Sequence, residues 1–213
     1  MKDYDKYIFD LDYTLLIPDW SKEDPFLENC VPVEEQEEFF KQKQDILNEY
    51  ELTFPKYDLK ELSDFFLSKG FHLSEESIRR WMIYNGETIE DEVVDGVIDL
   101  FKHLKEKGKK IVVLTSWFGG TQIPRLKRAG LYDYIDYVVA GDDAMKPDLE
   151  SFNLAIGDTP KDRCIMIGDS LKSDKRGADN AGIDSYIVDK EHTIRDFYNE
   201  VKNNYSKRKI LKD

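Results

Sequence analysis

Two aspartates stand two residues apart near the start of the chain, where an apolar run ends. Asp10 and Asp12 follow the run Tyr7–Phe9. Because side chains alternate along an extended chain, one carboxyl can enter a crevice while the other turns toward an adjacent point. Such a pair can supply a nucleophile and a proton carrier, or bind a hard cation. Taken alone, an Asp-x-Asp pair is more typical of a solvated turn or a helix cap.

Further polar groups follow other short apolar runs later in the chain. They are Thr115 with Ser116, Lys146 in the sequence Lys-Pro-Asp, and Asp169 with Ser170. The runs are rich in β-branched or aromatic residues and too short for ordinary helices, so we predict buried strands at Tyr7–Phe9, Ile111–Leu114, Tyr137–Ala140, Cys164–Ile167 and Ser185–Val188.

Helical patterns lie between the predicted strands and stop at glycines. One stripe consists of Val97, Ile98, Phe101 and Leu104 and stops at Gly108. Others stop at Gly130, Gly157 and Gly182. This alternation predicts an α/β fold with a doubly wound parallel sheet, a Rossmann-like core. Since ligands bind at the carboxyl ends of the strands in such a sheet, the polar groups are expected to converge there.

The converging residues have the chemistry needed for phosphoryl transfer. Asp10 and Asp169 could be the side-chain ligands of Mg²⁺, with the backbone carbonyl of Asp12 as a further ligand. The Asp10 carboxylate could then attack phosphorus, and Asp12 could protonate the leaving alcohol and later take a proton from water. Thr115 and Lys146 would bind oxygens of the transferring group.

A long interval between the first two of these groups has a different pattern. From about Ile17 to Asp91 no strong strand is predicted, but Glu34–Tyr50, Asp58–Lys69 and a segment capped by Ser74 look helical. We therefore expect an all-α cap domain at residues 17–91, inserted into a catalytic core of residues 1–16 and 92–213. The alternative is an ordinary extension of the hydrophobic packing of the core.

Four motifs in this order resemble those of the haloacid dehalogenase superfamily, in its capped phosphatase branch. They are Asp10–Thr14, the apolar run into Thr115, Lys146 in Lys-Pro-Asp, and Ile167–Asp174. The resemblance implies that Asp10 is the nucleophile and a Mg²⁺ ligand and that Asp12 is the acid and base. It further implies that Thr115, Ser116 and Lys146 bind phosphate, that Asp169 binds the metal, and that Asp174 is a ligand, directly or through water, or an anchor through Lys146.

Departures from the family pattern occur next to two motifs. Tyr13 stands where the family often has Gly or Asn, and Ser116 where Asn is common. Trp117 follows Thr115 closely, so a place beside the substrate and a place in packing are equally expected. Trp20, like Trp81, is expected to pack in the core or at the cap interface, and Glu23 to lie in a solvated loop.

The function that these motifs favour is magnesium-dependent hydrolysis of a small phosphomonoester, such as a nucleotide, a sugar phosphate or phosphoglycolate. A phosphomutase would use the same four motifs and stays an alternative, as does a catalytically silent binding module. A dehalogenase is disfavoured by Asp12, because that branch lacks the second aspartate of the first motif.

Composition limits the partners of the chain. Its 213 residues carry 31 Lys and Arg against 44 Asp and Glu, a formal charge of −13. This balance disfavours nucleic acid and anionic membranes as partners. The first residues lack the apolar stretch of a signal peptide, and Cys30 and Cys164 are too few for a disulfide framework, so we expect a cytoplasmic protein.

Overall fold

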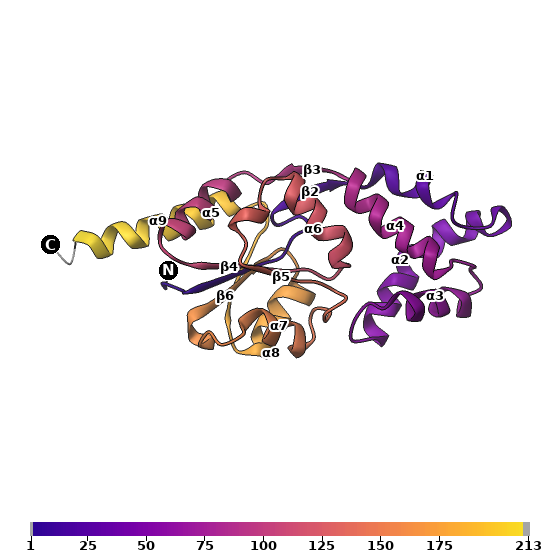
Figure 1. The fold of residues 1–213 in the computed structure, drawn as a ribbon. Helices are drawn as coiled ribbons and strands as arrows, with labels where there is room; N and C mark the ends of the chain where they lie inside the picture. Colours follow the sequence, from indigo (N-terminus) through magenta and orange to yellow (C-terminus); the bar gives the residue numbers. More distant parts are fainter. Residues whose placement is uncertain (1, 211–213) are drawn as a thin grey trace.

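A five-stranded parallel sheet forms the centre of one half of the molecule, in a computed structural model that describes residues 2–210 (Figure 1). Its order is β5-β4-β1-β6-β7, and all neighbouring strands are parallel. The strands are β1 Lys6–Phe9, β4 Lys110–Leu114, β5 Tyr137–Val139, β6 Cys164–Gly168 and β7 Asp184–Ile187. The five predicted strands are therefore confirmed, with ends that differ by one residue at most.

Helices cover both faces of this sheet (Figure 1). Alternate residues of the central strand face opposite sides: Phe9 belongs to a core with Phe101 and Phe197, whereas Ile8 belongs to a core with Phe152. The helices on the first face are α5 Val97–Glu106 and α9 Ile194–Ile210, and those on the second are α7 Leu149–Ile156 and α8 Arg176–Ala181. The predicted doubly wound α/β core is confirmed.

Helix α5 shows how the sequence specifies one of these elements. Leu100 and Leu104 lie on its buried face, and the helix ends just before Gly108, which adopts a left-handed φ of 67°. A glycine tolerates this conformation without steric cost. Ile98, assigned to the apolar stripe from the sequence, is 41% exposed instead. The buried face is displaced by one position and uses Leu100 in its place.

The interval after the first strand is mostly helical, as expected. It contains α1 Glu23–Leu27, α2 Val33–Thr53, α3 Leu59–Ser68 and α4 Glu75–Thr88. Asp58 caps α3 by accepting from the Glu61 N–H (3.0 Å), and Ser74 caps α4 by accepting from the Ser77 N–H (3.1 Å). The four helices share a hydrophobic core of their own that includes Phe39, Tyr50, Leu62, Phe66 and Trp81. The exact division into a 17–91 domain and a core stays a prediction.

Two short strands join the helical part to the sheet part. Strand β2, Leu16–Asp19, pairs antiparallel with β3, Glu90–Val93. These strands run across the expected boundaries at residues 16/17 and 91/92, so the expectation of an interval without strands is wrong at both ends. The chain leaves the core and returns to it side by side through this pair.

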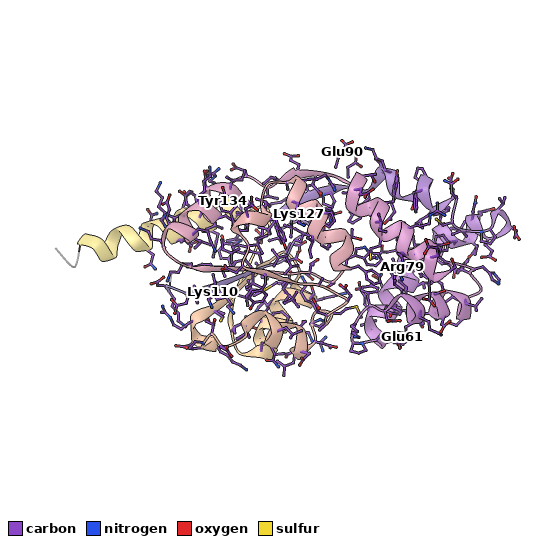
Figure 2. All side chains as sticks on the ribbon, in the orientation of Figure 1. Glu61, Arg79, Glu90, Lys110, Lys127 and Tyr134 are labelled. Carbon is purple, nitrogen blue, oxygen red and sulfur yellow. The ribbon has the colours of Figure 1, made fainter. Side chains whose placement is uncertain are left out.

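Direct contacts also hold the helical part against the core. Helix α4 packs on α6, Gly119–Arg128, where the Thr121 hydroxyl donates to the Met82 carbonyl (2.9 Å). The Tyr57 N–H donates to the Gly141 carbonyl (2.7 Å). Figure 2 shows Arg79 and Glu61 on the helical part, with Glu90 at its junction with the core.

The remaining elements are short turns, and none of the elements is suited to a membrane. The 3₁₀ turns are Trp20–Lys22, Tyr132–Tyr134 and Lys161–Arg163, and Leu171–Lys175 forms a π-helical turn. Among residues 2–210, no helix combines the length and the apolar character needed to cross a bilayer.

Candidate active site

Asp10 leaves the end of β1 and enters a buried cluster of charges. Its N–H donates to the Ile167 carbonyl at the end of β6 (2.9 Å), and its side chain accepts from the Thr14 hydroxyl (3.3 Å). The Lys146 ammonium donates to the Asp10 carboxylate and to Oδ1 of Asp174 (2.7 Å). All three charged residues are buried. One cation thus lies between two carboxylates, which leaves the cluster with an excess of negative charge.

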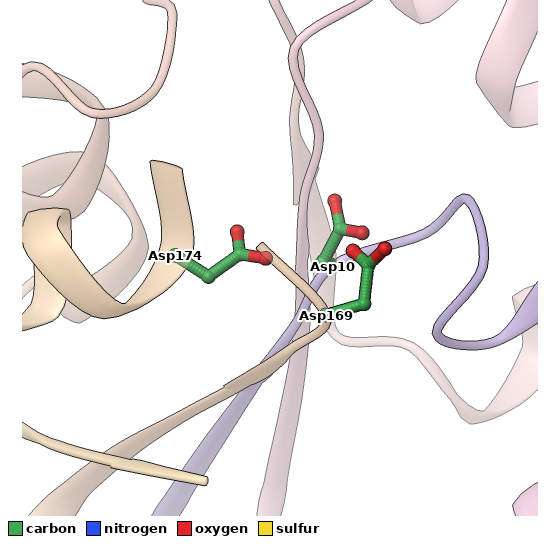
Figure 3. Close-up of side chains that lie close together, drawn as sticks. All are labelled: Asp10, Asp169 and Asp174. Carbon is green, nitrogen blue, oxygen red and sulfur yellow. The ribbon is translucent and has the colours of Figure 1, made fainter. Parts of the chain in front are cut away.

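Asp169 completes a triangle of carboxylates with Asp10 and Asp174 (Figure 3). One oxygen from each of the three lies within 4.8 Å of the others. Asp174 is held by the Ser170 N–H, which donates to its Oδ2 (3.0 Å). A Cβ on Gly168 would stand 2.1 Å from that same oxygen, so the end of β6 needs glycine for this approach. Three converging carboxylates form an oxygen-rich donor set that suits a hard divalent cation.

Burial acts on the protonation of this triangle. Desolvation raises the pKa of Asp10 to about 7, the charge of Lys146 opposes the shift, and Asp174 adds to it. Burial also raises the pKa of Asp169, with Asp174 as the next cause. Because both carboxylates gain from further positive charge, the electrostatics of the site fit a bound metal ion.

Asp12 lies on the other side of Asp10 and is held by two side chains of α6. Arg125 Nη2 donates to its Oδ1 (2.6 Å), and Gln122 Nε2 donates to its Oδ2 (3.1 Å). The same Gln122 nitrogen donates to the Thr115 hydroxyl oxygen (3.0 Å). The predicted acid and base and a predicted phosphate ligand are thereby joined through one amide.

Sequence reasoning missed Gln122, Arg125 and their partner Asp91. The only signal available was the spacing of Gln122 and Arg125, three residues apart on the helix that follows Thr115. Polar residues at that spacing are typical of a solvated helix face, whereas here both side chains are fully buried.

A cavity of about 610 Å³ connects these groups at the carboxyl ends of the strands. The predicted residues that line it are Asp10, Asp12, Thr115, Ser116, Lys146 and Asp169. Asp174 is fully buried behind Lys146 and does not line the cavity. The structure therefore brings the predicted set together and leaves Asp174 one layer deeper.

Aromatic rings from the helical part and the core form one wall of the cavity. Trp20, Tyr57, Trp81 and Trp117 all line it. The Trp117 ring lies 5.2 Å from that of Trp81 and 4.8 Å from that of Tyr57, measured between centroids. Trp117 thus combines the two expected places, in packing and beside the cavity. Trp81 is 1% exposed, in agreement with the expected packing role.

Glu23 belongs to this wall, so the expectation of a solvated loop is wrong for it. Its carboxylate accepts from Trp81 Nε1 (3.0 Å) and Asn85 Nδ2 (2.7 Å), and its second oxygen pairs with Lys43 (2.6 Å). Lys43 also pairs with Asp24 (2.6 Å). The carboxylate organises three side chains between α1, α2 and α4.

Tyr13, a departure from the family pattern, has an unusual backbone conformation. Its φ of 61° is left-handed, which L residues other than Gly, Asn and Asp rarely adopt. The Gly or Asn that the family often has at this position fits that geometry. Tyr13 keeps its ring at the edge of the cavity, 54% exposed.

The parallel sheet, the helical segment after its first strand and the carboxylate and lysine cluster at the strand ends define a class of α/β enzyme. The family model described as haloacid dehalogenase-like hydrolase matches residues 4–182, and the chain belongs to this family. The resemblance inferred from the four motifs is confirmed, and so is the predicted class, a phosphatase-type hydrolase.

Known relatives cover most of the chain. It is 28% identical over 206 residues to the pyrimidine 5'-nucleotidase PynA of Streptococcus pneumoniae, covering 89% of this chain and 85% of that one. It is 34% identical over 101 residues to the pyrophosphatase PpaX of Halalkalibacterium halodurans, 46% of each chain. The solved structure of the putative HAD-hydrolase YfnB of Bacillus subtilis, bound to magnesium, covers 94% of this chain and 100% of its own, with 21% identity and a TM-score of 0.65.

Proposed function

We propose that this protein is a magnesium-dependent phosphomonoester hydrolase that acts on a small phosphorylated metabolite through an aspartyl-phosphate. The observation that carries the proposal is the cavity at the strand ends, where Asp10, Asp12, Thr115 and Lys146 lie together. These residues supply a nucleophile, a proton carrier and ligands for phosphoryl oxygens. The two unpaired cysteines support the further proposal of a reducing, cytoplasmic setting.

The carboxylate triangle fits the proposed metal. Asp10 and Asp169 would hold Mg²⁺ with their side chains and Asp12 with its backbone carbonyl, while Asp174 would act from behind, through Lys146 or water. When bound, the ion would reduce the repulsion between a carboxylate nucleophile and an anionic phosphate. The magnesium-bound YfnB, which is also 29% identical to this chain over 99 residues, supports this choice of ion.

The residues of the cavity account for both halves of the reaction. In the first, an oxygen of Asp10 bonds to phosphorus, the ester P–O bond breaks, and Asp12 gives its proton to the leaving oxygen. In the second, Asp12 takes a proton from water as that water bonds to phosphorus, and the bond to Asp10 breaks. Thr115, Ser116 and Lys146 would bind the equatorial oxygens throughout.

The wall of the cavity favours a nucleoside monophosphate over phosphoglycolate or a bisphosphate. Among the lining residues that the structure describes, the cations are Lys43 and Lys146, and both are paired with carboxylates. No unpaired cation in this described lining is thus available for a second anionic group. A base could stack on the exposed aromatic edge near Trp117, a contact worth about 1–3 kcal/mol per base. The nucleotidase activity named for PynA supports the same choice.

Replacement of the nucleophile tests the reaction. Phosphate release from p-nitrophenyl phosphate should require Mg²⁺, and Asp10→Asn should abolish it because an amide cannot form the acyl-phosphate. Activity that survives in Asp10→Asn would disprove the assigned nucleophile. Isomer formation without phosphate release would favour the mutase alternative.

A substrate panel tests the leaving group. We expect kcat/KM for a nucleoside 5'-monophosphate to exceed that for phosphoglycolate by at least about tenfold, given one stacked base. Trp117→Leu should lower this value for the nucleotide but not for ribose 5-phosphate, which has no base. Equal losses on both substrates would show that Trp117 only packs.

A further inference from the structure

The acid and base candidate Asp12 is tied to a buried guanidinium that nothing in the reaction scheme above uses. Arg125 is 0% exposed and is bracketed by two carboxylates, Asp12 and Asp91. Resting on the function proposed above, we propose that Arg125 and Gln122 are positioning residues that fix the Asp12 carboxyl for proton transfer, and that Asp91 holds Arg125 in place.

The donors of Arg125 are fully assigned. Its Nη2 donates to Asp12 Oδ1 and to Asp91 Oδ1, each at 2.6 Å, and its Nε donates to both Asp91 oxygens at 3.1 and 3.2 Å. Its Nη1 donates to Gln122 Oε1 (2.6 Å). A buried guanidinium is costly unless it is paired and its donors are satisfied, and Asp91, with a side chain only 5% exposed, meets that need.

The bond from Arg125 fixes which way the Gln122 amide faces. Because Oε1 accepts from the guanidinium, Nε2 must face Asp12 Oδ2 and the Thr115 hydroxyl. The Thr115 oxygen then accepts from Gln122, so its own proton is free to donate to a phosphoryl oxygen. One chain of hydrogen bonds therefore orients both the proton carrier and a phosphate ligand.

The Asp12 carboxyl is consequently held at both oxygens, by two residues one helical turn apart on α6. Each carboxylate oxygen has two lone pairs, so one position on each stays open for the transferable proton. A proton carrier that must serve two steps benefits from such a fixed orientation, because proton transfer requires hydrogen-bond distance to the leaving oxygen and then to water. Asp91 lies in β3, which places the anchor of this network on the strand that leaves the helical part.

Leaving-group dependence separates a positioning role from a structural one. The value of kcat/KM reports steps up to departure of the leaving group, and nitrophenolate departs without a proton whereas an alkoxide needs one. We therefore compare p-nitrophenyl phosphate with an alkyl ester, glycerol phosphate, in Gln122→Met, Arg125→Lys, the benchmark Asp12→Asn, and Lys127→Gln as control. Lys127 lies on the same helix and is exposed.

We expect Gln122→Met to lower kcat/KM for glycerol phosphate by about 10²-fold, within the range for general acid catalysis, with a loss at least tenfold smaller for p-nitrophenyl phosphate. Arg125→Lys, which keeps the charge but loses the fork of donors, should shift the ratio the same way, and Lys127→Gln should leave it unchanged. Equal losses on both substrates, or no loss, in folded Gln122→Met and Arg125→Lys would overturn the proposal while Asp12→Asn still shifts the ratio. An unchanged ratio in Asp12→Asn would instead overturn the acid and base role on which the proposal rests.

Discussion

At the scale of single residues, Lys146 carries the largest electrostatic load in the site. Its side chain is 3% exposed and is the ion-pair partner of both Asp10 and Asp174. Although burial opposes it, the two carboxylates raise the pKa of Lys146, which keeps the ammonium charged. The residue thus both stabilises the buried acids and offers a cation to a phosphoryl oxygen.

Removal of this ammonium should damage folding and catalysis together. We expect Lys146→Met to lower kcat/KM by about 10²–10³-fold, the usual loss for one charge-stabilising donor. We also expect the free energy of unfolding to fall by about 3 kcal/mol, because two carboxylates lose their buried partner. Urea denaturation and p-nitrophenyl phosphate assays measure the two effects. A variant with activity within twofold of the parent would contradict the assigned role.

Tyr13 should be a site where stability can be gained. Its left-handed φ of 61° costs about 1–2 kcal/mol for an ordinary L residue, and asparagine reduces that cost. Tyr13→Asn is therefore expected to raise the free energy of unfolding by about 1 kcal/mol, as measured in urea. Phe at the same position, which keeps the strain, is the matched control and should be neutral. A loss of stability in Tyr13→Asn would mean that the tyrosine ring contributes more than the strain removes.

At the scale of elements, the close approach of α4 to α6 fixes the helical part on the core. A Cβ on Gly86 would meet the Gly120 carbonyl oxygen at 2.9 Å, whereas a Cβ on Gly120 would meet only the mobile end of Met82 at 3.0 Å. The two glycines therefore face the same interface with different freedom to adjust.

This difference gives a matched pair of substitutions. Gly86→Ala should lower the free energy of unfolding by about 1–3 kcal/mol, because backbone must move to admit the methyl group. Gly120→Ala should be neutral or slightly stabilising, since alanine is the better helix former by about 1 kcal/mol and Met82 can shift. Chemical denaturation of both variants measures this, and equal effects would refute a backbone-limited contact.

The same elements show what the sequence can and cannot predict. The strands that carry Asp10, Thr115 and Asp169 were predictable because they are buried on both faces and read as continuous apolar runs. Strands β2 and β3 were not, because Leu-Ile-Pro-Asp contains a proline and Glu-Asp-Glu-Val is almost entirely acidic. Their pairing comes from the geometry of the junction and not from local preference.

The candidate site divides in a similar way. Asp12 and Lys146 were predictable because polar residues at strand ends must meet at one rim of a parallel sheet. Burial of Gln122 and Arg125 was not, since their partners Asp12 and Asp91 lie far away in sequence. Long-range ion pairs leave no periodic signal in a single chain.

At the scale of the whole molecule, metal binding should couple the site to stability. A cation that binds the carboxylate triangle of the folded protein adds about 2.7 kcal/mol at a concentration 100 times its Kd. We therefore expect Mg²⁺ to raise the Tm and EDTA to lower it and abolish activity. Asp169→Asn should lose most of the rise because it removes a proposed ligand. An identical Tm with Mg²⁺ and with EDTA would contradict a metal site in the triangle.

The central claim is that Asp10 becomes phosphorylated during turnover. The most direct measurement is rapid acid quench with p-nitrophenyl phosphate and Mg²⁺, followed by borohydride reduction and peptide mass mapping, in the parent and in Asp12→Asn, which should slow loss of the phosphoryl group. The account predicts that Asp10 alone is converted to homoserine, in proportion to a burst of nitrophenolate. A stoichiometric burst with Asp10 unmodified, or with the label on another residue, would contradict it.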